Sequence, residues 1–302
     1  MSSSRRSVAV VTESTAIVPR HLVEELDIGV APLTVSINDQ PYRDGIDIDA
    51  DTFYRLLPTL ETLPTTSQPS PGAFYERFAA ALARYDHVVC ITISGGLSGT
   101  YESARIAARM IAEERGLTLA AGDERAVDAL APVTVIDSRT VAQPLGIIVV
   151  EAAKLARSGA DPSQVAARAR ELVSRIGFLG MVDTVEYLVK GGHVPKVAGM
   201  ATRALGLKPM IKFENGEVLP AGIARNVRQG LHRMVDLLVH DALGKKHVVA
   251  WVAHADAADR AQELEDLIHD HFPALVIERV GFTPVMGTHT GPGLVGLGFL
   301  AE

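Results

Sequence analysis

The sequence predicts an α/β protein of two domains: an N-terminal domain with a mainly parallel sheet and flanking helices (1–160), and a C-terminal mixed α/β domain (161–302). At 302 residues the chain is long enough for two hydrophobic cores. Strand and helix patterns alternate through the first half, which is typical of a parallel sheet covered on both faces. In the second half a hairpin signal, Asn215-Gly216, lies among helical patterns and indicates a mixed sheet.

The N-terminal elements follow from apolar runs, which predict strands, and from apolar residues at helical spacing, which predict helices. A first strand, "SVAVVTES", precedes a short helix opened by Pro19, and one continuous second strand is expected over residues 28–38. Helices are expected from about Asp49 and from Pro71. The remaining elements are strand "HVVCITIS", helix "SGTYESARIAARMIAEER", strand "VTVIDS" and helix "PLGIIVVEAAKLARSG". The polar stretch "AAGDERAVDAL" between the last two strand–helix units is expected to be a surface insertion.

The C-terminal domain begins with a helix that has Asp161 as its N-cap and Pro162 at its first position. The strand "GFLGMVD" and two helical stretches around "KGGHVPK" follow, and then the hairpin "KPMIKFENGEVLPAG". The last predicted elements are helix "NVRQGLHRMVDLLVHDAL", strand "HVVAWVAH", helix "AADRAQELEDLIHD", strand "ALVIERV" and strand "GLVGLGFL". A hairpin among helices in this order is the pattern of a mixed sheet.

Composition excludes several classes of function. The 29 basic and 36 acidic side chains give a net charge of −7, which argues against general nucleic-acid binding, and 5% aromatic residues argue against stacking on single strands. The first residues lack a secretory-signal pattern, and the most apolar helix pattern is too short to span a bilayer. We therefore expect a soluble, cytoplasmic protein. The single cysteine, Cys90, lies in the apolar run "HVVCITI" and is predicted to be inert core.

Three segments rich in hydroxyl groups and glycine stand out: "LPTTSQPS", "ITISGGLSGTYESA" and "GTHTGPG". A glycine-rich turn between a strand and a helix lets the backbone approach a ligand, and the N-terminus of the helix favours an anion. No lysine follows these glycines as a phosphate-binding P-loop requires, and the dinucleotide fingerprint is also absent. Neutral donors and one imidazole suit a single negative charge, so a carboxylate or a lone phosphate ester is the favoured ligand.

Structural explanations for the same segments remain open. Ser70 followed by Pro71 is a good helix cap, the second segment could be a tight turn, and the third could be a glycine-rich connection with an exposed histidine. His269 and His271 lack a third clear ligand, so no metal site is expected.

As a set and in this order, the segments "VTESTAIVP", "TTSQPSPGAFYERF", "ISGGLSGTYESA", "YLVKGGHVPK", "LGLKPMIKFENGEVLP" and "THTGPGLVGLGF" resemble the DegV family over nearly the whole chain. The resemblance implies a two-domain α/β protein that is not an enzyme and binds one long-chain fatty acid between its domains. It also implies that the acyl carboxylate is presented to the catalytic subunit of a fatty acid kinase. No cofactor other than the bound fatty acid, no nucleic acid and only transient membrane contact are expected.

By the same resemblance, the fatty-acid carboxylate is held by the hydroxyls of Thr66 and Ser67, by Ser94 with the Gly95 amide, and by His289 with its neighbour Thr290. Arg225 corresponds to an arginine associated with kinase docking. Two positions depart from the family: His193 replaces an arginine, and Glu13 replaces an aspartate, where we expect only an adjusted turn. The alternative is a small hydrolase or phosphotransferase that uses Ser94 and His289, although no acidic residue flanks "THTGPG" to orient the base.

Overall fold

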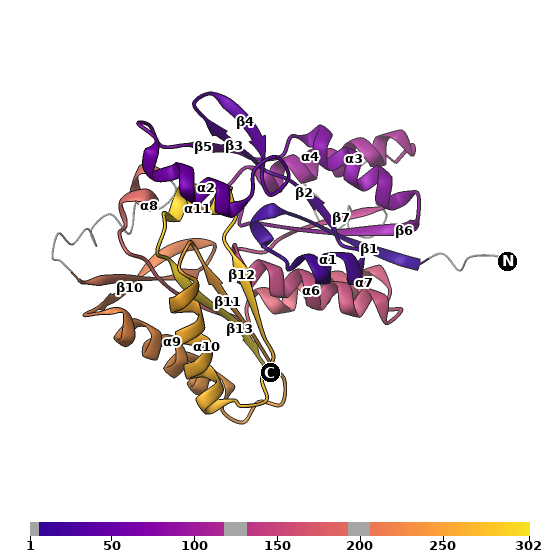
Figure 1. The fold of residues 1–302 in the computed structure, drawn as a ribbon. Coiled ribbons are helices and arrows are strands. Elements are labelled where there is room, and N and C mark those ends of the chain that lie inside the picture. Colours follow the sequence, from indigo (N-terminus) through magenta and orange to yellow (C-terminus); the bar gives the residue numbers. More distant parts are fainter. Residues whose placement is uncertain (1–5, 118–131, 193–205) are drawn as a thin grey trace.

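The structure is a computed structural model that describes residues 6–117, 132–192 and 206–302. Two main sheets are joined through a central helix, and a small third sheet lies above them near the junction (Figure 1). The expected insertion at residues 120–130 and the departure at His193 fall outside the described residues. Among the described helices, none has the length and apolarity needed to cross a membrane.

The N-terminal sheet is entirely parallel, as predicted. Its order is β2-β1-β6-β7, with bounds β1 (Arg6–Glu13), β2 (Gly29–Ala31), β6 (Tyr85–Thr92) and β7 (Val133–Asp137). Helices α3 (Pro71–Leu82) and α4 (Thr100–Glu114) cover one face, and α6 (Gln143–Arg157) and α7 (Pro162–Val173) cover the other, with α1 (Arg20–Leu26) packed on α6. Cys90 is fully buried in the core on the α3/α4 side, which confirms its predicted place.

The prediction of one strand over residues 28–38 is wrong. The segment forms β2 and then β3 (Thr34–Ile37), which belongs to a separate antiparallel sheet of order β4-β3-β5. Pro32 lies between them and has no backbone N–H to continue a ladder. The other two strands are β4 (Gln40–Arg43) and β5 (Thr65–Ser67), with α2 (Ala50–Leu56) and the 3-10 turn η2 (Leu57–Thr59) between them. Part of the "LPTTSQPS" segment is therefore a strand and not a loop.

The C-terminal sheet is mixed, as predicted. Its order is β10-β9-β8-β13-β11-β12, and every neighbouring pair is antiparallel except β11 with β12. The bounds are β8 (Ile176–Met181), β9 (Lys208–Glu214), β10 (Glu217–Ala224), β11 (Val248–His254), β12 (Ile277–Gly281) and β13 (Val295–Ala301). Asn215 and Gly216 form the predicted hairpin turn, both with positive φ (53° and 86°). Helices α9 (Val227–Ala242) and α10 (Ala258–His271) pack on this sheet, and the short helices are α8 (Glu186–Lys190) and α11 (Pro284–Thr290).

Helix α6 lies between the two main sheets and contacts β1 on one side and β13 and β11 on the other. Residues 143–150 are all buried, because the helix has no face toward solvent over these turns. Gly296 and Gly298 of β13 make room for its first turn: a Cβ at Gly298 would lie 2.7 Å from Cβ of Gln143. Gln143 Nε2 donates to the Gly296 carbonyl at 2.9 Å. The glycine-rich C-terminal strand is therefore the surface that receives the central helix.

Helix α7 packs against β6 and β7 of the N-terminal sheet and against α6. The sequence-based boundary at residue 160 would separate this helix from the sheet on which it packs. We propose instead a boundary between Val173 and Ile176, where the chain passes into the C-terminal sheet.

Candidate functional site

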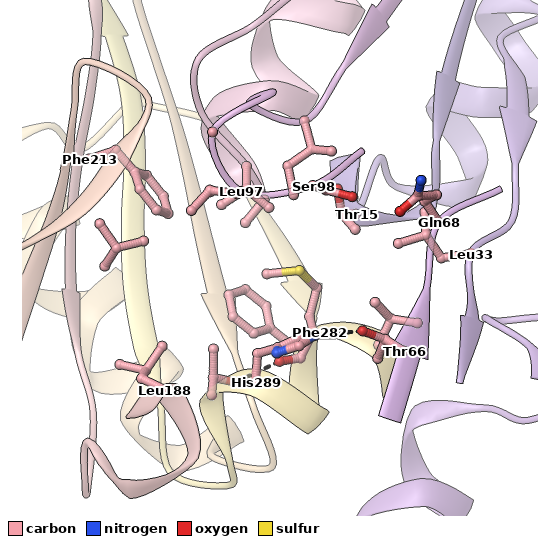
Figure 2. Close-up of a pocket in the computed structure, with 18 of the residues that line it drawn as sticks. Thr15, Leu33, Thr66, Gln68, Leu97, Ser98, Leu188, Phe213, Phe282 and His289 are labelled. Atoms are coloured by element: carbon pink, nitrogen blue, oxygen red, sulfur yellow. Dashed lines mark hydrogen bonds between the residues drawn. The ribbon is translucent and has the colours of Figure 1, made fainter. Parts of the chain in front are cut away.

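A cavity of about 400 Å³ lies where the three sheets meet (Figure 2). Its size is within the range of small-molecule sites. The polar residues of its wall are Thr15, Thr66, Ser67, Gln68, Ser98, His289 and Thr290. The apolar side chains are Leu33, Ile93, Leu97, Val141, Ala142, Phe178, Leu188, Ile211, Phe213, Val218, Phe282, Val285, Met286 and Leu294. Within the described wall there is no lysine or arginine, so any anion bound here would rest on neutral donors and one imidazole.

His289 lies on the last turn of α11 and not in an exposed loop, which corrects the expectation for "GTHTGPG". Thr283 caps the helix by accepting from the Met286 N–H, and Pro284 occupies the first position. The carboxyl group of Asp44 accepts from the Val285 N–H at 3.1 Å, which satisfies one of the N–H groups that the first turn of the helix leaves without a partner in the helix. These contacts fix the short helix and hence the direction of its histidine.

Gly191 and Gly287 allow the surroundings of His289 to pack closely. A Cβ at Gly191 would lie 2.7 Å from His289 Nδ1, and a Cβ at Gly287 would lie 2.6 Å from the Tyr54 hydroxyl. Any larger residue at either position would displace the imidazole or α11. The imidazole is therefore held between the end of α8 and the small sheet.

Thr66 and His289 meet at the cavity wall: Thr66 Oγ1 and His289 Nε2 are 2.8 Å apart (Figure 2). Thr66 comes from β5, whose pairing with β3 sets the side chain opposite Val35. If Nε2 carries the proton, the threonine accepts from it and its own hydroxyl proton is available to a ligand. In that tautomer the Thr66 hydroxyl can donate a hydrogen bond into the cavity, and a carboxylate is a suitable acceptor for it.

Ser67 and Gln68 are exposed residues of the wall, so the cavity reaches solvent beside them. Gln68 lies over Gly99, where a Cβ would be only 2.4 Å from its Nε2. Thr290 also lines the cavity, but its hydroxyl donates to the Met286 carbonyl at 3.0 Å. That proton is committed to the helix, so Thr290 offers the cavity an acceptor and not a donor.

Ser94 and Gly95 are placed differently from the expectation. Neither is among the described residues that line the cavity. Ser94 Oγ donates to the Gly216 carbonyl at 2.8 Å, and the Gly95 N–H donates to Asp137 at 3.2 Å. The following residues of the same loop, Gly96 to Gly99, form the wall instead. The glycine-rich loop therefore lines the cavity as expected, but with residues 96–99 and not with Ser94 and Gly95.

The hydrolase alternative requires a serine hydroxyl bonded to the imidazole. Ser94 Oγ is instead bonded to a backbone carbonyl of the hairpin turn, and His289 Nε2 is bonded to Thr66. The arrangement needed for a serine nucleophile is not the one that these two side chains adopt.

Arg225 is exposed and lies just before α9, whose N-cap is Asn226. Its backbone N–H donates to Gln229 Oε1 at 2.7 Å, and its side chain is not part of the described cavity wall.

Glu13 does more than adjust a turn. Its buried carboxylate accepts from the Thr15 N–H at 2.7 Å, from the Thr15 hydroxyl at 2.8 Å and from the Ile93 N–H at 3.0 Å. Thr15 and Ile93 both line the cavity, so this one side chain ties the ends of β1 and β6 together beneath it. Burial raises the pKa of Glu13 to about 7, against the lowering effect of the three donors.

The stability of the protein should depend on pH through Glu13. Because its folded-state pKa of about 7 lies above the ordinary value of 4.5, the folded state retains a proton that the unfolded state has released. Stability should then fall as pH rises from about 4.5 to about 7, by up to about 3 kcal/mol. Glu13→Gln cannot titrate at this position. The amount by which its free energy of unfolding falls below that of the wild type should therefore shrink as pH rises across this window. Urea unfolding of both proteins at pH 5 and pH 8 measures this, and parallel stability curves would contradict it.

Several wall residues were not found from the sequence. Thr15 and the aromatic side chains Phe178, Phe213 and Phe282 carry no motif, since apolar strand residues are ordinary core in most proteins. One signal could have identified α11: Thr283-Pro284 followed by Gly291 is the pattern of a helix start and stop. Among the described residues, no group of three or more His, Cys, Asp or Glu is arranged to hold a metal ion.

Comparison with known proteins gives a consistent result. Residues 7–302 match the family model described as "Uncharacterised protein, DegV family". A DegV domain-containing protein of Halalkalibacterium halodurans is 32% identical over 296 residues, which is 98% of this chain and 99% of the relative. Two solved structures are similar: a DegV family protein from Thermus thermophilus, described with fatty acid binding (TM-score 0.85, 28% identity, 98% and 100% coverage), and DegV from Bacillus subtilis, described as a fatty acid binding protein (TM-score 0.83, 27% identity, 98% and 100% coverage).

Proposed function

Because the chain belongs to the DegV family, we propose that it binds one long-chain fatty acid in the cavity between its sheets. Thr66 and His289, with Ser67 beside them, hold the carboxylate, and the apolar wall covers the acyl chain. Thr290 lies beside them in the wall, but its hydroxyl proton is bonded to the Met286 carbonyl and is not given to the carboxylate.

The observation that carries the proposal is the Thr66–His289 pair, with Thr66 on the side of the cavity that also holds Gln68, opposite Phe213 and Leu188 (Figure 2). A fatty acid has one charge and a long apolar chain, and the wall offers neutral donors at one place and hydrocarbon elsewhere. Each buried CH₂ contributes ~0.8 kcal/mol, so the chain supplies most of the affinity and the head group sets the orientation. A polyphosphate ligand would instead call for lysine, arginine or a metal.

The second part of the proposal is that the bound carboxylate is presented to a fatty acid kinase in the cytoplasm, and that the protein is not itself the enzyme. Arg225, just before α9, and Arg228, in its first turn, are both exposed, so their guanidinium groups are accessible to an acidic surface of a partner. Arg225 is therefore the residue that we assign to docking. No observation favours the hydrolase, since Ser94 Oγ is bonded to the Gly216 carbonyl.

The proposal predicts that the purified protein carries fatty acid. Denaturation and mass spectrometry of the extract should release a stoichiometric amount, and native mass spectrometry should show the corresponding mass on the folded chain. Delipidated protein should take up added palmitate or oleate. A folded protein that releases no fatty acid and takes up neither compound would overturn the proposal.

A further inference from the structure

The cavity has two chemically different sides. Figure 2 shows Gln68 and Thr66 on one side and Phe213 and Leu188 on the opposite side. With the carboxylate at Thr66 and His289, the acyl chain has to run toward the second side. What ends the cavity there then decides how long a chain fits.

Two phenylalanines stack at this end. The rings of Phe178 on β8 and Phe213 on β9 have centroids 4.4 Å apart and an interplanar angle of 25°. Phe178 is 7% exposed and Phe213 is half-buried, and both rings line the cavity. Stacking of this kind adds to the stabilisation that burial alone gives.

Phe178 is fixed by glycines on neighbouring positions of the sheet. A Cβ at Gly180 would lie 2.9 Å from its ring, and a Cβ at Gly296 would lie 3.1 Å from it. The ring therefore lies flat on the sheet in space that only glycine leaves open. It cannot move deeper to admit more ligand, because the backbone of β8 and β13 is directly beneath it.

Phe213 is fixed from the other domain. The turn of its hairpin contains Gly216, whose carbonyl accepts from Ser94 Oγ at 2.8 Å, and Ser94 is only 1% exposed. A Cβ at Gly96 would lie 3.2 Å from the same carbonyl, so the glycine-rich loop fits closely against the hairpin turn. Ser94 is thus a positioning residue: it holds the tip of the hairpin that carries Phe213 against the N-terminal sheet.

We propose that the stacked pair of Phe178 and Phe213 is the chain-length stop of the cavity. The inference rests on the proposed fatty-acid binding and goes beyond it by naming the residues that set the longest chain accepted. A chain that reaches the rings meets side chains held on both sides and cannot extend further without displacing them.

The test replaces the half-buried member of the pair. Phe213→Ala removes the ring and opens space at the end of the cavity, and Phe272→Ala removes a comparably half-buried phenylalanine that is not part of the described wall. Binding of saturated C14, C16, C18 and C20 fatty acids is measured for the wild type and both variants by competition in native mass spectrometry. Circular dichroism checks the fold of each variant.

We expect Phe213→Ala to prefer a longer chain than the wild type does. A chain two methylenes beyond the wild-type limit should gain roughly fifteenfold in affinity relative to its affinity for the wild type, from the burial of those methylenes. Phe272→Ala should keep the wild-type order of affinities. If Phe213→Ala does not fold, Phe178→Leu, which keeps a large apolar side chain but removes the stack, should give the same direction of shift.

Failure of the proposed fatty-acid binding and failure of the chain-length stop give different results. If the wild type binds none of the four acids, the proposed function itself is wrong. If the wild type binds them and folded Phe213→Ala, or Phe178→Leu in its place, keeps the same longest chain, then only the chain-length stop is overturned.

Discussion

Replacing His289 with alanine should weaken fatty-acid binding by about tenfold to hundredfold, the value of one hydrogen bond to a charged group. The imidazole Nε2 lies 2.8 Å from Thr66 Oγ1, and without it the threonine hydroxyl loses the partner that orients it toward the ligand. Because the acyl chain keeps its apolar contacts, binding should be weakened and not abolished. Fatty acid in the extract of purified His289→Ala should be substoichiometric, and titration of the delipidated variant gives the change in Kd.

The matched control is His271→Ala, which removes an exposed histidine at the end of α10, away from the described wall. Its fatty-acid content and Kd should equal those of the wild type. Thermal unfolding of delipidated His289→Ala separates a binding defect from a folding defect. A folded His289→Ala protein with the wild-type Kd would remove His289 from the head-group site.

The head-group residues could be predicted only in part from the sequence. "TTSQPS" and "GTHTGPG" attract attention by their hydroxyls, and the structure does bring Thr66 and His289 together although 223 positions separate them. Ser94 belongs to the most conspicuous motif of all, yet its hydroxyl is bonded to the hairpin turn. A sequence motif shows that a loop approaches a site but not which way each side chain in it points, because that depends on contacts made by distant segments.

The fold shows the same division between local and distant contacts. The parallel sheet and the Asn215-Gly216 hairpin were predictable because alternation and turn chemistry are local signals. The third sheet was not, since β3 and β5 are three to four residues long and their pairing is non-local. Helix α11 was missed because its hydroxyl- and glycine-rich sequence is typical of a loop, and it is the capping by Thr283 and the contact with Asp44 that stabilise it.

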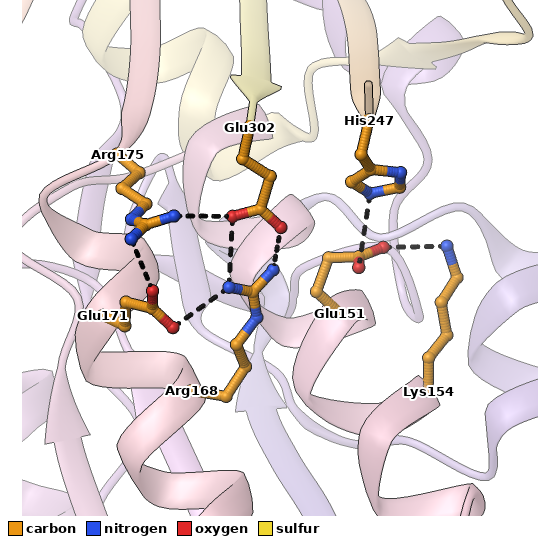
Figure 3. Close-up of polar contacts among 7 residues, drawn as sticks. All are labelled: Glu151, Lys154, Arg168, Glu171, Arg175, His247 and Glu302. Atoms are coloured by element: carbon orange, nitrogen blue, oxygen red, sulfur yellow. Dashed lines mark hydrogen bonds and ion pairs between the residues drawn. The ribbon is translucent and has the colours of Figure 1, made fainter. Parts of the chain in front are cut away.

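Two kinds of contact join the N-terminal layer to the C-terminal sheet, and their magnitudes differ. At the surface, Glu302 at the end of the C-terminal sheet pairs with Arg168 of α7 and with Arg175 just after α7, whereas Glu171 pairs with both arginines within the N-terminal layer (Figure 3). These hydrogen bonds, that of Arg168 first, lower the pKa of Glu302. Partly exposed pairs of this kind contribute at most about 1 kcal/mol each.

In the interior, α6 is buried against both sheets over residues 143–150, and removing even one large apolar side chain from such a core costs about 2–5 kcal/mol. The central helix, and not the ion pairs, should therefore decide whether the two layers hold together.

Gly146→Ala tests this conclusion and should destabilise the protein by about 2 kcal/mol or more. The added Cβ would lie 2.4 Å from the Ala16 carbonyl oxygen and 2.5 Å from Cζ3 of Trp251, so α6 would have to move away from the N-terminal backbone and the buried indole at once. Alanine in a helix interior is otherwise better than glycine by about 0.5–1 kcal/mol, which the clash has to exceed. Urea unfolding measures the loss of stability, and the fluorescence of the single tryptophan, Trp251, follows it at the side chain that the new Cβ would contact.

Gly72→Ala is the matched control, because it makes the same change in α3 with only Ser70 Oγ, at 3.6 Å, near the new Cβ. It should leave stability unchanged or raise it slightly, as expected for a helical glycine in open space. Arg175→Ala, which removes the ion pairs to Glu302 and Glu171, should cost less than Gly146→Ala. If Gly146→Ala were as stable as Gly72→Ala, or if Arg175→Ala were the more damaging of the two, α6 would not be the element that joins the sheets.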